Sequence, residues 1–398
     1  MSEPTLADAA HLASRYADQL LVGTTRDVHR AIASRVLTLT RQQHTPVGLL
    51  YDTITGGVYG GVGLATRALG RMGELGIGTS TDLERTQRGR RLRSVVNGLS
   101  GDVLRDQGHP AAITASFRLG GRDLELHHGA LRTAYPDATE RVVVFVHGLC
   151  EDEDCWSYHR ADRGPTYLER LRGKGRWTPL AVRLNSGVPI QHNAVELVAL
   201  VDRLVDAWPR DVHEIAFVGH SLGGLVVRAA ADPASRSPWS DRVSHVVLLG
   251  SPHGGAPLER LVKRAVPAMQ RLPEVAPFAT ILEERSVGIR DLHDGIGVDA
   301  ALWPDATYHC VGATLGKDER SLAGRMFGDL LVLLHSAQGS GAKVDADFRR
   351  ITSAHHFDLL NHPLIHADLA RWLGEPVAAD LGPVVAAAPG PTPVDQIF

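Results

Sequence analysis

The pattern of hydrophobic and polar positions changes character partway along the chain. Before residue 109, apolar positions recur every three or four residues, as in AAHLASRYADQLLVGTTRDVHRAIASRVLTLT, which predicts amphipathic helices. From Ala111 onward the pattern becomes short apolar runs, at residues 142–148, 179–185, 214–219, 243–250 and 307–313. Helical patterns lie between the runs, the clearest at residues 193–208 with Asn193 as its expected N-cap. Continuous apolar strands that alternate with helices predict an α/β fold with a mostly parallel sheet flanked by helices.

Three segments follow from this pattern. We expect an N-terminal helical accessory region at residues 1–109, an α/β domain at 110–375 and a disordered Pro/Ala-rich tail at 376–398. Near the start of the domain, Gly120-Gly121 separates two strand-like runs and predicts a two-residue β-hairpin. Within the domain, about residues 256–300 form an amphipathic stretch interrupted by prolines, which predicts a helical cap.

Composition and charge narrow the function classes. The 398 residues carry a net charge of −3 and no long basic tract, so we expect no nucleic-acid partner. Three cysteines do not suggest a secreted disulfide framework, although a Cys150–Cys155 bridge is a minor alternative. We expect no signal peptide and no membrane span, and therefore a cytoplasmic protein. The glycine-rich residues 45–70 leave peripheral membrane contact of the N-terminal helices open, and nothing predicts the oligomeric state.

The strongest chemical signal is FVGHSLGG, residues 217–224. The motif Gly219-His220-Ser221-Leu222-Gly223 directly follows an apolar strand and directly precedes a helical run. G-x-S-x-G alone is weak evidence, but the strand–turn–helix context is the one that a nucleophile elbow requires. A side chain at either glycine would collide with neighbouring backbone, and Ser221 would take a strained conformation.

A second glycine turn, at the end of the run VVVFVHG, complements the serine. Gly148 allows the loop to approach Ser221, so we assign an oxyanion hole to the backbone N–H groups of Leu149 and Leu222. The acidic run at residues 151–154 is expected at the mouth of the site or simply solvated, and the arginines at 85–93 on a solvated helix face. A zinc site at His362 and His366 is disfavoured because no Glu follows His362, so we expect no metal.

Together these motifs resemble the α/β-hydrolase superfamily, in particular bacterial lipase- and esterase-like hydrolases related to the GPI inositol-deacylase type. The resemblance covers roughly residues 111–374 and rests on HGLCEDEDCW, GHSLGG, LLGSPHGGAP, SVGIRDLHDG, GDLLVLLHS and HHFDLLNHP. It implies a triad in the chain order Ser, acid, His. The N-terminal 110 residues are not found in typical compact lipases, so lid architecture does not transfer.

The resemblance implies the other two members of the triad. The family pattern places the base at His356, with His355 as the alternative, and the acid at Asp329. The other acid candidates are Asp318, Glu319, Asp345 and Asp347. The remaining polar residues expected to shape the pocket or support its loops are His147, Gly148, His220, Ser251 and His253.

These residues predict a serine carboxylic-ester hydrolase that acts on a lipid-like or apolar acyl ester, in lipid metabolism. His356 would take the proton of Ser221, and the reaction would pass through an acyl-enzyme without any metal or organic cofactor. An acyltransferase or a thioesterase on the same triad is the enzyme alternative. A binding or scaffold protein on a hydrolase fold is the non-enzyme alternative.

Overall fold

A single mixed β-sheet organises the chain. The computed structural model describes residues 84, 86–253, 286–288, 291, 301–314 and 346–375. Within these residues the sheet has eight strands in the order β2-β1-β4-β3-β5-β6-β7-β8. The strands are β1 (Ser116–Leu119), β2 (Arg122–Asp123), β3 (Arg141–Val146), β4 (Thr178–Arg183), β5 (Glu214–His220), β6 (Val243–Leu249), β7 (Thr307–Thr314) and β8 (Ala346–Thr352).

Strand directions agree with the apolar runs of the sequence. From β4 to β8 all neighbouring strands are parallel, whereas β1 pairs antiparallel with β4 and with β2. The predicted hairpin joins β1 to β2, with Leu119 opposite Arg122. Gly120 and Gly121 have φ values of 58° and 75°, which two-residue hairpin turns of this kind require. The mostly parallel sheet is therefore confirmed.

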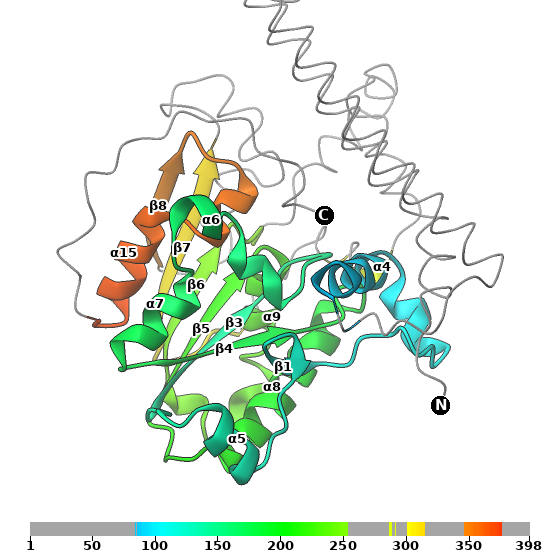
Figure 1. The fold of residues 1–398 in the computed structure, drawn as a ribbon, viewed down its shortest axis with the longest axis horizontal. Coiled ribbons are helices and arrows are strands. Elements are labelled where there is room, and N and C mark those ends of the chain that lie inside the picture. The colour runs from blue at the N-terminus through cyan, green and yellow to red at the C-terminus, as the bar shows by residue number, and fades with distance from the viewer. Residues whose placement is uncertain are drawn as a thin grey trace, which may run out of the picture.

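Helices cover both faces of the sheet (Figure 1). The helices are α4 (Gln87–Asp106), α5 (His128–Ala134), α6 (Arg160–Arg163), α7 (Tyr167–Lys174), α8 (Ile190–Ala207), α9 (Leu222–Ala229) and α15 (Pro363–Trp372). Short 3₁₀ turns include η3 (Glu153–Ser157) and η6 (His356–Leu360). On one face Val142 and Val144 of β3 pack with α5, α8 and α9; on the other, Val143 and Phe145 pack with η3, α7 and α15. Every residue of β3 after the first is buried, as expected for a strand with a core on each side.

Helix α8 begins earlier than its sequence pattern indicated. Pro189 occupies the N-cap position, and Asn193 lies inside the helix instead of capping it. The side-chain amide of Asn193 is buried and donates to the carbonyl of Asn185 over 2.9 Å. The expected N-cap was wrong because this asparagine binds a loop from within the helix.

Helix α4 packs against the loops that follow β3 and β4. A Cβ on Gly98 would lie 2.3 Å from Sγ of Cys150, and one on Gly101 would lie 1.8 Å from Oδ1 of Asn185. The hydroxyl of Ser286 also donates to the carbonyl of Gly98 over 2.7 Å. A domain boundary at residue 109 remains a prediction, but α4 itself is in contact with the α/β domain.

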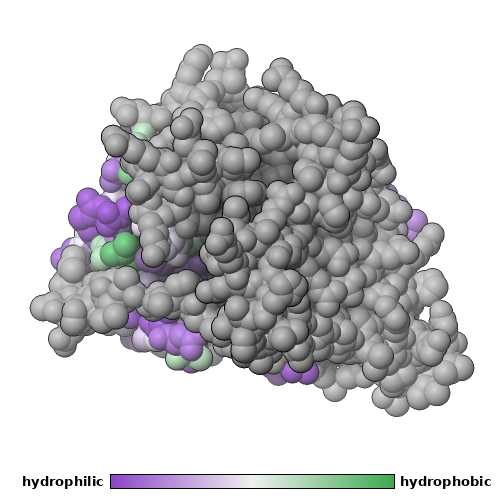
Figure 2. Space-filling view, turned by 90° about the horizontal axis from the view of Figure 1, so that it is seen from above, coloured by the Kyte–Doolittle hydropathy of each residue, from purple (hydrophilic) through white to green (hydrophobic). Residues whose placement is uncertain are grey.

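Few apolar side chains reach the surface of the described part of the chain. Its exposed large hydrophobic residues are Val103 and Val195. In the view from above, the described residues that are visible are mostly hydrophilic (Figure 2). None of the helices in the described ranges is long and apolar enough to cross a membrane.

Candidate active site

Ser221 lies at a sharp turn between β5 and α9. Its φ of 51° and ψ of −121° place a non-glycine residue in a region that L-amino acids rarely adopt. Such a conformation costs on the order of 1–3 kcal/mol and persists only where the surrounding structure enforces it. Part of that restraint is the amide of Ser221, which donates to the carbonyl of Leu249 at the end of β6 over 2.8 Å.

The two glycines of the motif are required by close backbone contacts. A Cβ on Gly219 would lie 2.5 Å from Cα of Gly224, and one on Gly223 would lie 2.3 Å from the carbonyl oxygen of Val146. Both distances are far below van der Waals contact. The collision that the sequence predicted at both positions is therefore present in the fold.

The loop after β3 approaches the serine at Gly148. A Cβ on Gly148 would lie 3.1 Å from Cβ of Ser221. The imidazole of His147 holds this loop, because its Nδ1 donates to the carbonyl of Gly148 over 2.8 Å and its Nε2 accepts from the amide of Leu184 over 2.9 Å. Burial lowers the pKa of His147, so the ring is neutral and can both donate and accept. His147 thus acts on the shape of the loop.

The two amides assigned to the oxyanion hole belong to the residues that directly follow Gly148 and Ser221. Leu222 is the first residue of α9, where an N–H group has no acceptor within the helix. The amide of Leu149 donates no hydrogen bond to any other described residue. Among the described residues neither amide has an acceptor, and the role of both groups stays a prediction.

His356 packs against the turn that carries Ser221. Its Cε1 and Nδ1 lie 3.0 and 3.1 Å from the position that a Cβ on Gly250 would take, and its ring centroid is 4.6 Å from that of His220. Gly250 directly follows Leu249, the partner of the Ser221 amide. His355 faces elsewhere: its Nδ1 lies 3.3 Å from the carboxylate of Asp358. This placement favours His356 over His355 as the base.

Glu151 is a site residue that the sequence analysis missed. Its Oε2 accepts from the amide of Gly148 over 2.6 Å and lies 3.0 Å from Nδ1 of His220. Burial would raise the pKa of Glu151, but His220 and the Gly148 N–H outweigh it and hold the pKa below its usual range. Nε2 of His220 in turn lies 3.4 Å from the carbonyl oxygen of His356. One carboxylate therefore contacts both the oxyanion loop and the ring that packs on His356.

The rest of the acidic run is not simply solvated, so of the two expected placements the solvated one is wrong. Glu153 binds Arg118 over 3.0 Å and Arg183 over 2.7 Å, and Glu84 binds the same two arginines. Asp152 is 2% exposed. The run turns inward because buried guanidinium groups lie beneath it, which a local sequence pattern does not reveal. The arginines of α4 are divided: Arg88 is exposed as expected, whereas Arg90 binds Asp154 over 2.7 Å.

Ser251 and His253 lie behind the nucleophile turn, against α9. Ser251 is fully buried, and a Cβ on Gly224 would lie 1.9 Å from its Oγ. Nδ1 of His253 lies 3.1 Å from Nη1 of Arg228 on α9. Burial and then the charge of Arg228 lower the pKa of His253 to about 3, so this imidazole is neutral. Both residues contact the helix that follows Ser221.

Several predicted features lie outside the described residues. These are Asp329, the alternatives Asp318, Glu319 and Asp345, most of the cap at about 256–300, residues 1–83 and the tail at 376–398. Asp347 is described and contacts other groups: its Oδ2 accepts from Nε1 of Trp372 over 3.3 Å and lies 4.0 Å from Nδ1 of His309. The acid of the triad therefore stays a prediction, with Asp347 disfavoured.

The histidines considered as zinc ligands form hydrogen bonds within the fold, and the cysteines considered for a disulfide are unbonded. His362 is the N-cap of α15 and accepts from the amide of Leu364, and Nε2 of His366 lies 2.7 Å from Oδ1 of Asn361. Cys150, Cys155 and Cys310 are all free thiols. The minor alternative of a Cys150–Cys155 bridge is not observed.

Similar proteins are found among solved structures and in one family model. The comparison with curated proteins gave no match. Among solved structures, a Bacillus licheniformis lipase, BlEst2 in its mature form, is 18% identical with a TM-score of 0.38, and the match covers 58% of this chain and 91% of that one. The Pyrococcus furiosus esterase Pf2001 is 16% identical with a TM-score of 0.37, covering 60% and 82%. An esterase from Thermogutta terrifontis is 15% identical with a TM-score of 0.36, covering 60% and 90%.

These structural similarities are too distant to support an argument about function. A family model matches a larger part of the chain. The match spans residues 143–390, which include the glycine turn after β3, the Ser221 elbow and His356. The model is that of the Alpha/beta hydrolase family. With the sheet order and the strained serine already established, the chain belongs to the alpha/beta hydrolase family.

Proposed function

We propose that this chain is a serine carboxylic-ester hydrolase of the lipase or esterase kind. The observation that carries the proposal is the strained Ser221, held between two obligatory glycines, with the ring of His356 packed beside the same turn. A serine hydroxyl is a weak nucleophile until an adjacent base takes its proton. Strain that serves no packing purpose is typical of a position selected for reactivity.

In this mechanism, His356 accepts the proton of Ser221 as its oxygen attacks the ester carbonyl. The amides of Leu149 and Leu222 stabilise the negative charge that forms on the carbonyl oxygen. The alcohol leaves with the proton from His356, and water then cleaves the acyl-enzyme by the same route. Asp329 is the proposed acid that orients the imidazole.

We further propose an apolar or lipid-like acyl ester as substrate. The support is the amphipathic character of about residues 256–300, whose apolar positions suit a cap over an acyl chain. The resemblance to GPI inositol-deacylase-like hydrolases agrees with a lipid ester but does not fix the head group.

The test is hydrolysis of a chain-length series of nitrophenyl esters by the full chain. We expect Ser221→Ala and His356→Ala each to lower kcat/KM on the order of 10⁴-fold, because triad members act as a unit. His355→Ala is the matched control and should retain most of the activity. Covalent labelling by a fluorophosphonate should require Ser221. Absence of labelling on folded protein would favour a scaffold function, and faster turnover of thioester than of ester probes would favour a thioesterase.

A further inference from the structure

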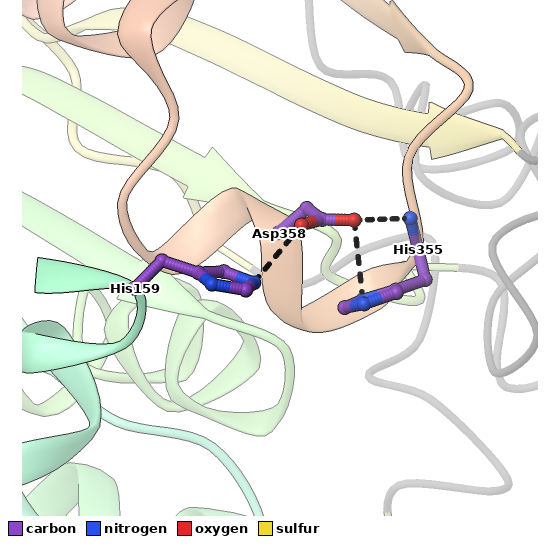
Figure 3. A group of neighbouring side chains, drawn as sticks. All are labelled: His159, His355 and Asp358. Carbon is purple, nitrogen blue, oxygen red and sulfur yellow. Dashed lines mark hydrogen bonds and ion pairs between the residues drawn. The ribbon is translucent and has the colours of Figure 1, made fainter. Parts of the chain in front are cut away.

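Three potential metal ligands from distant parts of the chain meet beside the turn that carries His356. His159 lies between η3 and α6, His355 directly precedes η6, and Asp358 lies within it. One ligand atom from each residue lies within 4.8 Å of the other two. Figure 3 shows both imidazole rings turned toward the carboxylate that lies between them.

The separations match those of donor atoms around a small divalent ion. Nε2 of His159 lies 3.5 Å from Oδ1 of Asp358, and Nδ1 of His355 lies 3.3 Å from Oδ2. Ligands at about 2.0–2.1 Å from a tetrahedral zinc ion are roughly 3.3 Å apart. Each imidazole therefore stands at about ligand spacing from one oxygen of Asp358, but the two imidazoles face different oxygens. Binding of one ion by all three residues requires their ligand atoms, which lie within 4.8 Å of one another, to draw closer together.

One of the ligand nitrogens, Nδ1 of His355, has no hydrogen bond. Nδ1 of His355 is buried, and its contact with Oδ2 of Asp358 at 3.3 Å does not have the geometry of a hydrogen bond. A buried polar atom without a hydrogen bond is uncommon in folded proteins and calls for an explanation such as an ion.

The outer contacts of the cluster are those that metal ligands usually have. Nδ1 of His159 lies 3.4 Å from a carboxylate oxygen of Asp162, and Nη2 of Arg163 donates to Oδ1 of Asp358 over 2.5 Å. Ligating imidazoles commonly give their second nitrogen to a carboxylate, and ligating carboxylates are themselves hydrogen-bonded. The aromatic ring of Tyr158 packs on one side of the cluster, and its centroid lies 4.1 Å from that of the His159 ring.

Charge limits the affinity of such a site. The carboxylates of Asp358 and Asp162 attract a cation, whereas the guanidinium of Arg163 opposes it. Two imidazoles and one carboxylate select zinc or another late transition metal over magnesium or calcium. With one cation among its neighbours, the site should bind zinc more weakly than a closed structural site of four ligands.

We propose that His159, His355 and Asp358 bind one divalent transition-metal ion, preferentially zinc. The ion would join the loop after β3 to the turn that carries His356. It takes no part in ester chemistry, so the proposal goes beyond the proposed function and holds or fails without it. The expectation of no metal from the sequence was based on His362 and His366, which are used elsewhere.

The experiment is zinc titration of the EDTA-treated full chain by calorimetry, in the presence of a weak competing chelator. Wild type should bind one equivalent, and His159→Ala should lower the affinity at least about 10-fold. Arg163→Gln should bind zinc at least as tightly as wild type, because it removes the opposing charge. His192→Ala is the control, since His192 forms a partly exposed pair with Glu196 on α8 and should not affect binding.

A second measurement guards against loss of the fold. Circular dichroism should show His159→Ala folded, and zinc should raise the Tm of wild type but not of this variant. Cobalt-substituted protein should show the visible absorption of a four-coordinate ion. Equal zinc affinity of wild type and His159→Ala, or the absence of specific binding to wild type, overturns the proposal. Ester hydrolysis is not among these readouts, so failure here leaves the proposed function unaffected.

Discussion

Replacing Asp152 with asparagine should stabilise the folded protein above pH 7. Burial, followed by the charges of Glu153 and Asp154, raises the pKa of Asp152 to about 7 from an ordinary value of 3.8. The folded state therefore holds this proton more tightly than the unfolded state does, and stability falls as pH rises from about 4 to about 7. At 1.36 kcal/mol per pKa unit, the ionised carboxylate costs the fold about 4 kcal/mol above pH 7.

Asparagine removes this cost and keeps the useful contact. Oδ1 of Asp152 accepts from the amide of Asp154 over 2.9 Å, and an amide oxygen can accept the same bond. The gain in unfolding free energy of Asp152→Asn over wild type should therefore grow by about 3 kcal/mol between pH 4.5 and pH 8. The variant must be compared with wild type at each pH, because other groups also change stability over this range. The pKa values of His253 and His309 are lowered to about 3 and about 4, so both proteins become less stable as pH falls below 6.5.

The assay is urea unfolding followed by tryptophan fluorescence at intervals from pH 4.5 to pH 8. Glu169→Gln is the control of opposite sign. The hydrogen bond from Arg160 and, less strongly, that from the amide of Thr166 outweigh the effect of burial and hold the pKa of Glu169 below 4.5. Glu169→Gln should therefore be less stable than wild type at pH 8, and the difference should shrink in acid. A stability difference between Asp152→Asn and wild type that stays constant with pH would refute the reasoning.

Three further substitutions test the packing and the site. Gly223→Ala should lower the free energy of unfolding by at least about 3 kcal/mol, because the added Cβ collides with the carbonyl of Val146. Gly129→Ala is the control: its Cβ has ordinary contacts in α5, so thermal unfolding should show this variant neutral or slightly stabilised. Glu151→Gln should lower kcat roughly 10- to 100-fold with little change in KM, since it weakens charged hydrogen bonds that position Gly148 and His220; an unchanged kcat would contradict this role. Arg183→Ala should lower the free energy of unfolding by about 3–5 kcal/mol, because the buried Glu153 loses both hydrogen bonds from Arg183 and keeps only its contacts with Arg118 and Arg90 among the described residues. A small loss in chemical denaturation would argue against the network.

The sequence predicted the sheet well because each strand carries its own local signal. Strands buried on both faces are apolar throughout, so β3, β4, β5, β6 and β7 lie within a few residues of their expected positions. The elbow was also predictable, since the two glycines and the serine must be adjacent in the chain.

Contacts between distant residues were not predictable in the same way. Glu151 belongs to the site because the loop after β3 folds back onto His220, 69 residues away. A run of four acidic residues gives no local sign that Glu153 turns toward Arg118 and Arg183. Asn193 looked like an N-cap because asparagine is favoured there, but the tertiary contact with Asn185 decided its role.

The arginine–carboxylate cluster beneath the acidic loop has a consequence for any attempt to isolate the catalytic domain. Glu84 precedes α4 in the chain, but it forms ion pairs with Arg118 on β1 and Arg183 on β4 and so stabilises the sheet. Truncation at residue 110 would remove Glu84 together with the helix that packs over Cys150 and Asn185, and would leave two buried cations short of a counter-charge. The shortest stable hydrolase should therefore start upstream of Glu84.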